Sequence, residues 1–396
     1  MKVKTVWHLN ITSLISAFIF FICIRITYLN VGIKLTFMLK TVSIIILVSL
    51  FIFKRKKPEN ILVISGWYVI ILGSTLLNQR NIFNAADILS SSYLICLYLS
   101  YFDNSTKNKL RILETWTFLL FVLCVADGIS ILLYPNGMPT NSYFKLTWFL
   151  GYKTARLAYI LPLAVLISYL SYLKKRCLNI TAVAVILLCT VICFRVQATA
   201  AGVAMLLFLI LNLLMEFLHR KRDIREWIYK ILNYKILCIG YGFLFFFVTI
   251  IQTNPFIQYI IQNILNKSDT LSYRTGIWAA CLNRFFDNPL LGCGYLTNAE
   301  YTIITNYPLG TSAHSFILSI LVTTGIVGLV YYIFMLRYFL FRHEKSYEYH
   351  EAVALFGLLC ILIVGITSSA MVFSVFSGFI YILIDLKYSD EFLIKR

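Results

Sequence analysis

Apolar runs near the length of a membrane-spanning helix recur from one end of the chain to the other. Polar and charged residues collect between these runs. We count twelve runs, at residues 8–29, 34–53, 60–78, 85–102, 111–134, 154–173, 178–194, 198–217, 235–252, 314–341, 351–367 and 370–388. The pattern predicts an all-α integral membrane protein with about twelve transmembrane helices, in which residues 1–396 form a single polytopic membrane domain.

Short basic clusters follow every second apolar run and indicate the orientation of the chain. Cytoplasmic loops of membrane proteins carry the excess of Lys and Arg. Because of this parity, we expect a multi-pass protein with both termini in the cytoplasm. Lys2 and Lys4 precede the first run without a small-residue cleavage site after it, so we expect an uncleaved first span. The clusters lie at residues 54–57, 107–111, 174–176, 220–225 and 342–345.

Composition supports the membrane assignment and argues against a soluble protein and a nucleic-acid-binding protein. Sixty per cent of the 396 residues are apolar and 13% are charged, against about 25% charged residues in soluble domains. The net charge of +18 is divided among the short clusters, so we do not expect a nucleic-acid partner. The ten cysteines have no metal-ligand spacing. Whether Cys281 and Cys293 pair stays open, because sequence alone cannot set disulfide connectivity.

The most polar segment of the chain lies between the ninth and tenth runs. We expect residues 252–313 to form one large external loop that contains short helices and carries part of the active site. Asp269 is a suitable N-cap for a helix from about residue 270 to 286. The apolar stripe of that helix would be Ile277, Cys281, Leu282 and Phe285.

Turn-forming residues follow this expected helix. Asn288-Pro289 is expected to end it, because the residue before a proline is disfavoured in helical conformation. Gly292 and Gly294 allow a sharp turn. Ser312 is a plausible N-cap for the next membrane helix, which would place His314 in its first turn.

His314 and Arg274 are the strongest candidates for catalysis. The partial positive charge of a helix N-terminus disfavours imidazolium, so a neutral His314 ring would be available as a base or hydrogen-bond donor. The alternative is an interfacial histidine that caps a membrane helix. A guanidinium such as Arg274 binds phosphate oxygens through two donors. Its alternative is a solvated loop charge, paired with Asp269.

Three further cations lie at the expected outer ends of the sixth to eighth spans. Arg156, Arg195 and Lys153 would form, with the loop arginine, a pocket suited to a pyrophosphate. The competing interpretation is that they anchor the interface by extending towards lipid headgroups. Asp127, in the outer part of the fifth span, is a candidate ion-pair partner for one of them.

Aromatic and acidic residues contribute less to the prediction of a functional site. Trp278 and Tyr301 could stack on sugar faces, although such residues commonly form the aromatic belts of membrane proteins. The expected external carboxylates form no pair at metal-ligand spacing. We therefore expect no metal site, no cofactor and no two-carboxylate catalysis. These carboxylates are Asp87, Asp127, Asp269, Asp287 and Glu300.

Four motifs, taken together, resemble the O-antigen polymerase and O-antigen ligase family of membrane glycan-assembly enzymes. The strongest is Arg274-x-x-Ile-Trp278, followed by Asn288-Pro-Leu-x-Gly-x-Gly294, and next is Ala313-His314-Ser315, which leads into Gly325-Ile-x-Gly328. Weaker matches are Phe149-Leu-Gly151-Tyr-Lys153 and Gln197-Ala-Thr199-Ala200. The chain departs from the family pattern at three positions, with Thr154 in place of Asn, Ala198 in place of a common Arg, and Ser315 in place of Asn.

The resemblance implies a glycosyltransferase on the outer face of the cytoplasmic membrane. Its donor would be an oligosaccharide linked to undecaprenyl pyrophosphate, and a polymerase would use a second lipid-linked repeat unit as acceptor. His314 and Arg274 would be catalytic, and substrate binding would fall to Arg156, Arg195, Lys153, Trp278 and Tyr301. The bilayer, a chain-length regulator and a flippase are the other candidate partners.

Other functions stay open at this stage. A ligase would transfer the lipid-linked glycan to another acceptor, such as a lipopolysaccharide core, a teichoic acid or a protein. A polysaccharide transporter or flippase is a rival from another class, and paired Gly/Pro-interrupted spans in two repeated halves would favour it. A purely structural membrane scaffold would leave the polar loop without a purpose.

Overall fold

The computed structural model describes most of the chain. The described residues are 10–24, 32–54, 59–102, 105–139, 147–219, 225–251, 274–308, 310–341, 348–369, 374, 377–386 and 388. The expected cap Asp269 and the first part of the external loop lie outside them.

Helices account for nearly all of the regular structure, with a single two-stranded hairpin beside them. Capping residues begin several helices, and the side chains of Asn10, Asn81 and Asn179 each accept a backbone N–H of the first turn. The helices are α1 (Ile11–Cys23), α2 (Ile33–Phe53), α3 (Glu59–Leu77), α4 (Ile82–Tyr101), α5 (Thr106–Leu133), α6 (Leu157–Lys175), α7 (Ile180–Arg195), α8 (Thr199–His219), α9 (Arg225–Ile231), α10 (Tyr234–Ile251), α12 (Arg274–Asp287), α13 (Asn298–Thr305), α14 (Phe316–Phe341), α15 (Tyr349–Gly365) and α16 (Phe379–Asp385).

The expected all-α membrane architecture is confirmed. Each of the twelve apolar runs overlaps a helix. Within the described ranges, seven helices are long and apolar enough to cross a membrane, and α1, α7, α10 and α15 are shorter apolar helices. In the described part of the last run, the helix is the seven-residue α16. The number of spans and the cytoplasmic placement of the termini stay predictions.

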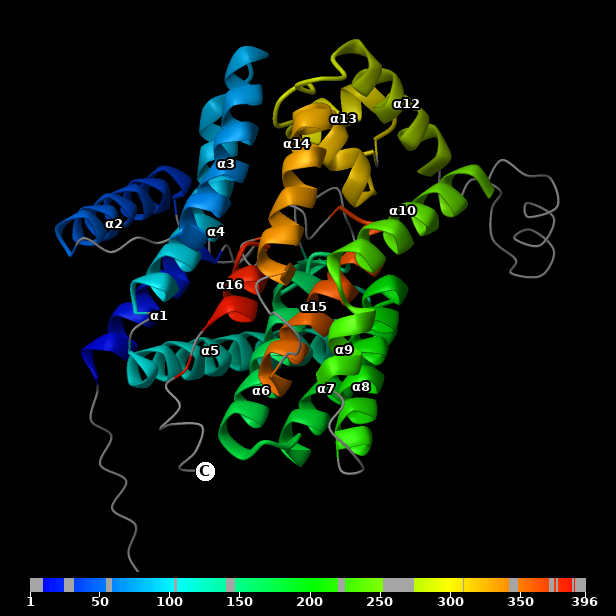
Figure 1. Cartoon of the computed structure of the whole chain (residues 1–396). Helices are drawn as coiled ribbons and strands as arrows, with labels where there is room; N and C mark the ends of the chain where they lie inside the picture. The colour runs from blue at the N-terminus through cyan, green and yellow to red at the C-terminus, as the bar shows by residue number, and fades with distance from the viewer. Residues whose placement is uncertain are drawn as a thin grey trace, which may run out of the picture.

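The helices pack into two connected groups. In the first, α3 packs on α4 and α14, and α2 packs on α4. In the second, α6 packs on α5 and α15, and α15 packs on α8, which in turn packs on α7. The short helices α12 and α13 lie at one end of α14 (Figure 1). Helix α12 contacts both α13 and α14. This end is the one at which the motifs of the external loop gather.

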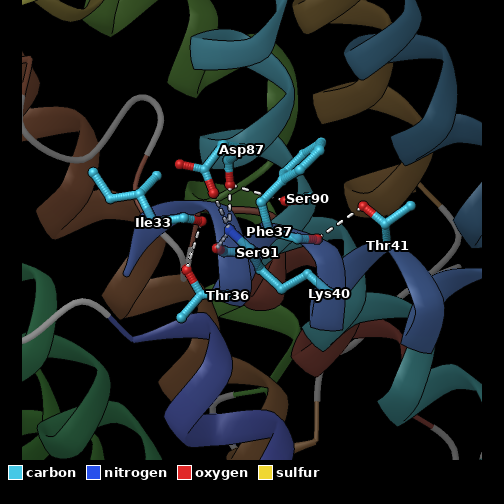
Figure 2. A network of polar contacts seen from close by, with 8 residues as sticks. All are labelled: Ile33, Thr36, Phe37, Lys40, Thr41, Asp87, Ser90 and Ser91. Carbon is cyan, nitrogen blue, oxygen red and sulfur yellow. Dashed lines mark hydrogen bonds and ion pairs between the residues drawn. The ribbon is translucent and has the colours of Figure 1, made fainter. Parts of the chain in front are cut away.

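Peripheral helices expose apolar side chains, as expected for contact with lipid. Helix α2 lies at the edge of the bundle (Figure 1) and has most of its large apolar side chains exposed, among them Met38, Ile45 and Phe53. A run of exposed apolar surface of this length is not tolerated in water. The helix is nevertheless fixed to the bundle by a buried ion pair, in which Lys40 contacts Asp87 of α4 (Figure 2).

Candidate functional site

Helix α14 is interrupted at Gly325, and the external loop fills the interruption. Gly325 has φ 64° and ψ −159°, so the helix cannot form its regular i to i−4 bonds there. The carbonyls of Val322 and Thr323 accept instead from the N–H groups of Cys293 (2.7 Å) and Gly294 (3.1 Å).

The backbone N–H groups that follow the interruption also find hydrogen-bond acceptors in the loop. The N–H groups of Ile326 and Val327 donate to the carbonyls of Pro289 (2.9 Å) and Leu290 (3.2 Å). A broken helix within a membrane protein is tolerated where neighbouring chain satisfies the released backbone groups. The Asn288-Pro…Gly294 motif and the Gly325 motif are therefore two halves of one backbone interaction.

Close backbone contact explains why three of the motif residues are glycine. Gly292, Gly294 and Gly325 all have positive φ, at 67°, 77° and 64°. A Cβ at Gly325 would lie 2.3 Å from the carbonyl oxygen of Leu290, and a Cβ at Gly292 would lie 2.6 Å from the carbonyl carbon of Thr323. Any side chain at either position would push the loop out of the interrupted helix. The expected sharp turn at Gly292 and Gly294 is thus confirmed.

Ser74 of α3 and Asn78, which directly follows α3, form hydrogen bonds to the loop where it meets the interrupted helix. The Ser74 hydroxyl lies 2.5 Å from the Leu291 carbonyl oxygen and accepts the Gly294 N–H at 3.1 Å. The side-chain amide of Asn78 donates to the Gly292 carbonyl at 3.0 Å. The loop, α3 and α14 therefore form one rigid support for the residues that follow.

Helix α12 presents Arg274 at its first turn and ends before Asn288-Pro289, as expected. Ile277, Cys281 and Phe285 of the expected stripe are buried, but Leu282 is 37% exposed and was wrongly assigned to it. A four-residue spacing returns to the same helical face, while Leu282 points about 100° away from Cys281. Arg274 is half-buried, and this burial lowers the pKa of its guanidinium.

Trp278 and Tyr301 lie inside a small apolar core beneath the loop, and only 4% and 6% of their surfaces are exposed. Burial raises the pKa of the Tyr301 hydroxyl well above its usual range. As placed here, the two rings leave little surface for a sugar and hold α12 and α13 against α14. The other members of this core are Ile277, Cys281, Phe285, Leu296, Ala313, Leu318 and Val322.

His314 does not lie in the first turn of a membrane helix, which corrects the sequence-based expectation. Helix α14 begins at Phe316, and His314 precedes it in left-handed backbone conformation, with φ 47°. Its N–H lies 3.4 Å from the Ser312 hydroxyl. Left-handed backbone is uncommon outside glycine and often marks functional turns. The half-buried ring still stands at the positive end of α14.

Arg156 is the most deeply buried of the candidate cations. It is the N-cap residue of α6, and none of its surface is exposed. Its Nε lies 3.6 Å from Asp127 Oδ2 of α5, and its guanidinium lies 4.9 Å from the centre of the Trp148 ring. The structure thus identifies Arg156 as the cation that Asp127 accompanies. Among the described residues, none of the three guanidinium nitrogens has a hydrogen-bond partner.

A short hairpin covers this arginine, and no pattern along the chain predicted it. Strands β1 (Thr147–Trp148) and β2 (Gly151–Tyr152) pair in antiparallel register around a tight turn. Three groups near the end of α5 hold the hairpin. Asp127 Oδ1 accepts the Leu150 N–H at 3.0 Å, the Ser130 hydroxyl accepts the Phe149 N–H at 3.2 Å, and the Tyr134 carbonyl accepts the Trp148 indole N–H at 2.8 Å.

Lys153 and Arg195 lie nearer the surface than Arg156. Lys153 follows the hairpin, half-buried, with its ammonium 5.9 Å from the centre of the Tyr152 ring. Arg195 is exposed at the last residue of α7. The expected short turn between α7 and α8 is confirmed, since α8 begins at Thr199. Three of the candidate cations therefore lie at the hairpin and at the ends of α6 and α7, and the fourth, Arg274, lies at the start of α12.

Cys281 and Cys293 do not form a disulfide. Both are buried thiols, and Cys293 Sγ lies 3.3 Å from the Arg284 carbonyl. Burial raises the pKa of the Cys281 thiol to about 12, so it is not a nucleophile at neutral pH. Among the described residues, no three His, Cys, Asp or Glu side chains come together as a metal site would require.

An open cleft of about 430 Å³ lies on the outer side of α12 and α13. Arg80, from the turn between α3 and α4, closes one side through a 2.7 Å contact with Glu300. Burial acts to raise the pKa of Glu300, but hydrogen bonds from Thr297 and Arg80 outweigh it and lower that pKa. Arg80 was not among the residues expected from the sequence, although a lone Arg in a short turn between two apolar runs was a readable signal. The lining also includes Ala280, Asn283, Arg284, Asp287, Ile303 and Ile304.

The fold and these residues define a polytopic helical membrane protein with cationic sites built on a loop and on helix ends. Comparison with known families narrows this class. A family model described as O-antigen ligase matches residues 144–333. This part of the chain is similar to the O-antigen ligase family, and the resemblance indicated by the motifs is confirmed. Comparison with curated proteins gave no match.

The matched range contains every catalytic and substrate-binding candidate taken from the sequence. It begins just before the hairpin and ends inside α14. Members of this family are glycosyl-transferring enzymes, either ligases or polymerases. Asp127 and Arg80 lie outside the matched range and reach the site only through tertiary contacts.

Proposed function

We propose that this protein polymerises oligosaccharide repeat units carried on undecaprenyl pyrophosphate, at the outer face of a bacterial cytoplasmic membrane. The product would be a surface polysaccharide, such as a capsule, an exopolysaccharide or an O-antigen. The observation that carries the proposal is the O-antigen ligase match over residues 144–333, which contains both Arg274 and His314. Arg274 begins α12 and His314 lies just before α14, and these two helices pack against each other.

The reaction requires one bond to form and one to break. The hydroxyl oxygen of the acceptor sugar attacks the anomeric carbon of the donor, and its proton passes to the His314 ring. The bond from that carbon to the pyrophosphate oxygen breaks, and undecaprenyl pyrophosphate leaves with the electron pair. No nucleotide sugar takes part, because undecaprenyl pyrophosphate is itself the leaving group. The proposed reaction is also independent of metal ions, with cationic side chains in the place of a metal.

Cations stabilise the charge that develops on the leaving group. Preorganised donors in a site shielded from water contribute most to such a step. Arg274 is half-buried at the start of α12, and Arg156 is fully buried, so both act in surroundings poorer in water than bulk solvent. Lys153 and Arg195, nearer the surface, would guide the anionic donor towards them.

The outer cleft would receive the glycan. Its lining supplies carboxylate, guanidinium and amide groups, which hydrogen-bond to sugar hydroxyls. A volume of about 430 Å³ falls within the range of small-molecule sites, about 300–1,000 Å³. Trp278 and Tyr301 would contribute by fixing the helices that form the cleft floor, and not by stacking on the sugar.

The test is reconstitution of the purified protein with a defined undecaprenyl-pyrophosphate repeat unit. We expect a ladder of polymer lengths that persists in the presence of a chelator and is lost in the His314→Ala and Arg274→Ala variants. Arg337→Ala, which removes an exposed arginine near the far end of α14, is the matched control and should keep the ladder. A full ladder from either site variant at normal protein levels would refute the residue assignment, and loss with chelator would refute the metal-free reaction.

A ligase is the second candidate, since the matching family model carries that description. The same reconstitution separates the two, because a ligase transfers one glycan to a different acceptor and builds no ladder from repeat units alone. A transporter is less well supported. Among the described helices, non-helical backbone occurs inside α14, whereas transporters commonly interrupt helices at matching positions in two repeated halves.

A further inference from the structure

Arg156 carries more hydrogen-bonding capacity than the residues around it use. A guanidinium has five N–H donors and no acceptor. Here it is fully buried, and within the described part of the chain all three of its nitrogens lack a hydrogen-bond partner. Its contacts are the Trp148 ring face and the Asp127 carboxylate, whose 3.6 Å approach to Nε is an ion pair without a hydrogen bond.

This arrangement is costly unless a further ligand completes it. Buried charges are ordinarily paired and hydrogen-bonded, because a donor removed from water without a replacement loses its full solvation. Asp127 neutralises the charge but leaves the terminal nitrogens unsatisfied. The missing partner must be an anion with several acceptor oxygens, since the free donors are planar, adjacent and cationic.

Asp127 is itself well positioned to stay in place when such an anion arrives. Its Oδ1 accepts the Leu150 N–H of the hairpin at 3.0 Å, so the carboxylate is anchored independently of the arginine. Its Oδ2 has no hydrogen-bond partner among the described residues. The contact between Asp127 Oδ2 and Arg156 Nε is therefore the weaker of these two contacts, and it is the one that an incoming anion can replace.

We propose that Asp127 is a resident counter-ion that holds the Arg156 guanidinium between reaction cycles and yields it to a pyrophosphate group. The identity of that group as the lipid-linked donor, or the product that leaves, rests on the proposed function; the exchange itself does not. Asp127 is a positioning residue in this account. Its negative charge opposes the bound pyrophosphate and so favours release of the spent carrier.

The proposed exchange predicts the direction of two effects of removing the Asp127 charge, one on stability and one on the affinity for pyrophosphate. Without the Asp127 charge, the empty protein holds an unpaired buried guanidinium and is less stable. For the same reason a pyrophosphate binds more tightly, because it becomes the sole counter-ion of Arg156 and no longer meets a nearby carboxylate. A merely structural ion pair would show the first effect without the second.

The test compares the wild type with Asp127→Asn, which keeps an oxygen for the Leu150 N–H and removes the charge. Thermal unfolding of the protein in lipid nanodiscs is followed with inorganic pyrophosphate, or with sodium chloride at equal ionic strength. We expect the variant to melt several degrees lower in chloride, and pyrophosphate to restore most of that loss. Its affinity for pyrophosphate should rise roughly tenfold, equivalent to about 1.4 kcal/mol.

Two control variants make the result specific. Ser130→Ala removes the neighbouring hairpin bond to Phe149 without touching the ion pair, and Asp87→Asn breaks the other buried pair. Both should lose stability without a gain in the response to pyrophosphate. Equal pyrophosphate responses in Asp127→Asn and the wild type, or an undiminished response in Arg156→Gln, would overturn the proposal.

The wild type provides a second measurement if Asp127→Asn does not fold. Pyrophosphate should stabilise the wild type and leave Arg156→Gln unaffected, and a wild type without any response would refute the exchange. Neither assay needs turnover, so they stand apart from the proposed reaction. If the reaction is also correct, Asp127→Asn should lower KM and kcat together, because release of the carrier slows.

Discussion

Two buried ion pairs in this protein differ in how completely they are hydrogen-bonded. The Lys40 ammonium is 1% exposed and uses its three donors on the Asp87 carbonyl (2.6 Å), the Asp87 carboxylate (2.5 Å) and the Ser91 hydroxyl (3.0 Å), as Figure 2 shows. The Arg156 guanidinium is equally buried but meets Asp127 at 3.6 Å without a hydrogen bond. The first pair is complete within the protein, and the second is not.

The difference separates a structural contact from the proposed binding site. Lys40 fixes the lipid-exposed α2 to α4, and its full set of partners leaves no donor for a ligand. Arg156 lies beside a hairpin within the matched family range, with donors to spare. Burial and charge are the same in both, so the hydrogen-bond inventory is what distinguishes them.

The largest effect is expected from Lys40→Met. It leaves the Asp87 carboxylate buried without its counter-ion, which costs about 3–5 kcal/mol of unfolding free energy. Denaturant unfolding in detergent micelles measures the loss. The double variant Lys40→Met/Asp87→Leu should recover most of it, because an apolar pair of similar volume is often neutral. A double variant as unstable as the single one would show that the pair has a role beyond charge balance.

A slightly smaller effect, on catalysis instead of stability, is expected from Arg156→Lys. The ammonium keeps the charge opposite Asp127 but cannot present several planar donors to a phosphate. We expect the rate of glycosyl transfer to fall about 10²–10³-fold, or about 2.7–4 kcal/mol, with the melting temperature nearly unchanged. Initial rates of polymer formation measure it. Arg337→Lys is the control and should keep its rate; an active Arg156→Lys enzyme would make the second pair structural, like the first.

The smallest effect concerns the partly exposed pair between Arg80 and Glu300, at 2.7 Å. Exposed pairs contribute about 0–1 kcal/mol. Because the folded-state pKa of Glu300 is lowered, its contribution is present above the ordinary carboxyl pKa of 4.5 and is lost as the pH falls through the lower folded value. Glu300→Gln should slightly lower stability at neutral pH and flatten this acid dependence, as pH-dependent melting would show. An unchanged acid dependence would mean that other carboxylates control it.

Several features were accessible from sequence because they are local. The apolar runs mark the helices, Asn288-Pro289 ends α12, and Gly292 and Gly294 turn the chain with positive φ. Helical spacing alone misplaced Leu282. The capping rule misplaced His314, because a left-handed turn delays the start of α14 to Phe316. A local pattern indicates that a helix begins nearby, but the first residue depends on what packs around it.

The sequence by itself determined the membrane class, the order of the helices and the family, because these depend on runs and motifs read along the chain. Only the tertiary structure decided which charged side chains form ion pairs with each other. Lys40 and Asp87 are 47 positions apart, and each appears in the sequence as a charge within an apolar run. Their pairing, like the incomplete pairing of Asp127 with Arg156, follows from the contacts of α2 with α4 and of α5 with α6. Hydrogen bonding acts over about 3 Å, so a donor's partner is set by helix packing and not by separation along the chain.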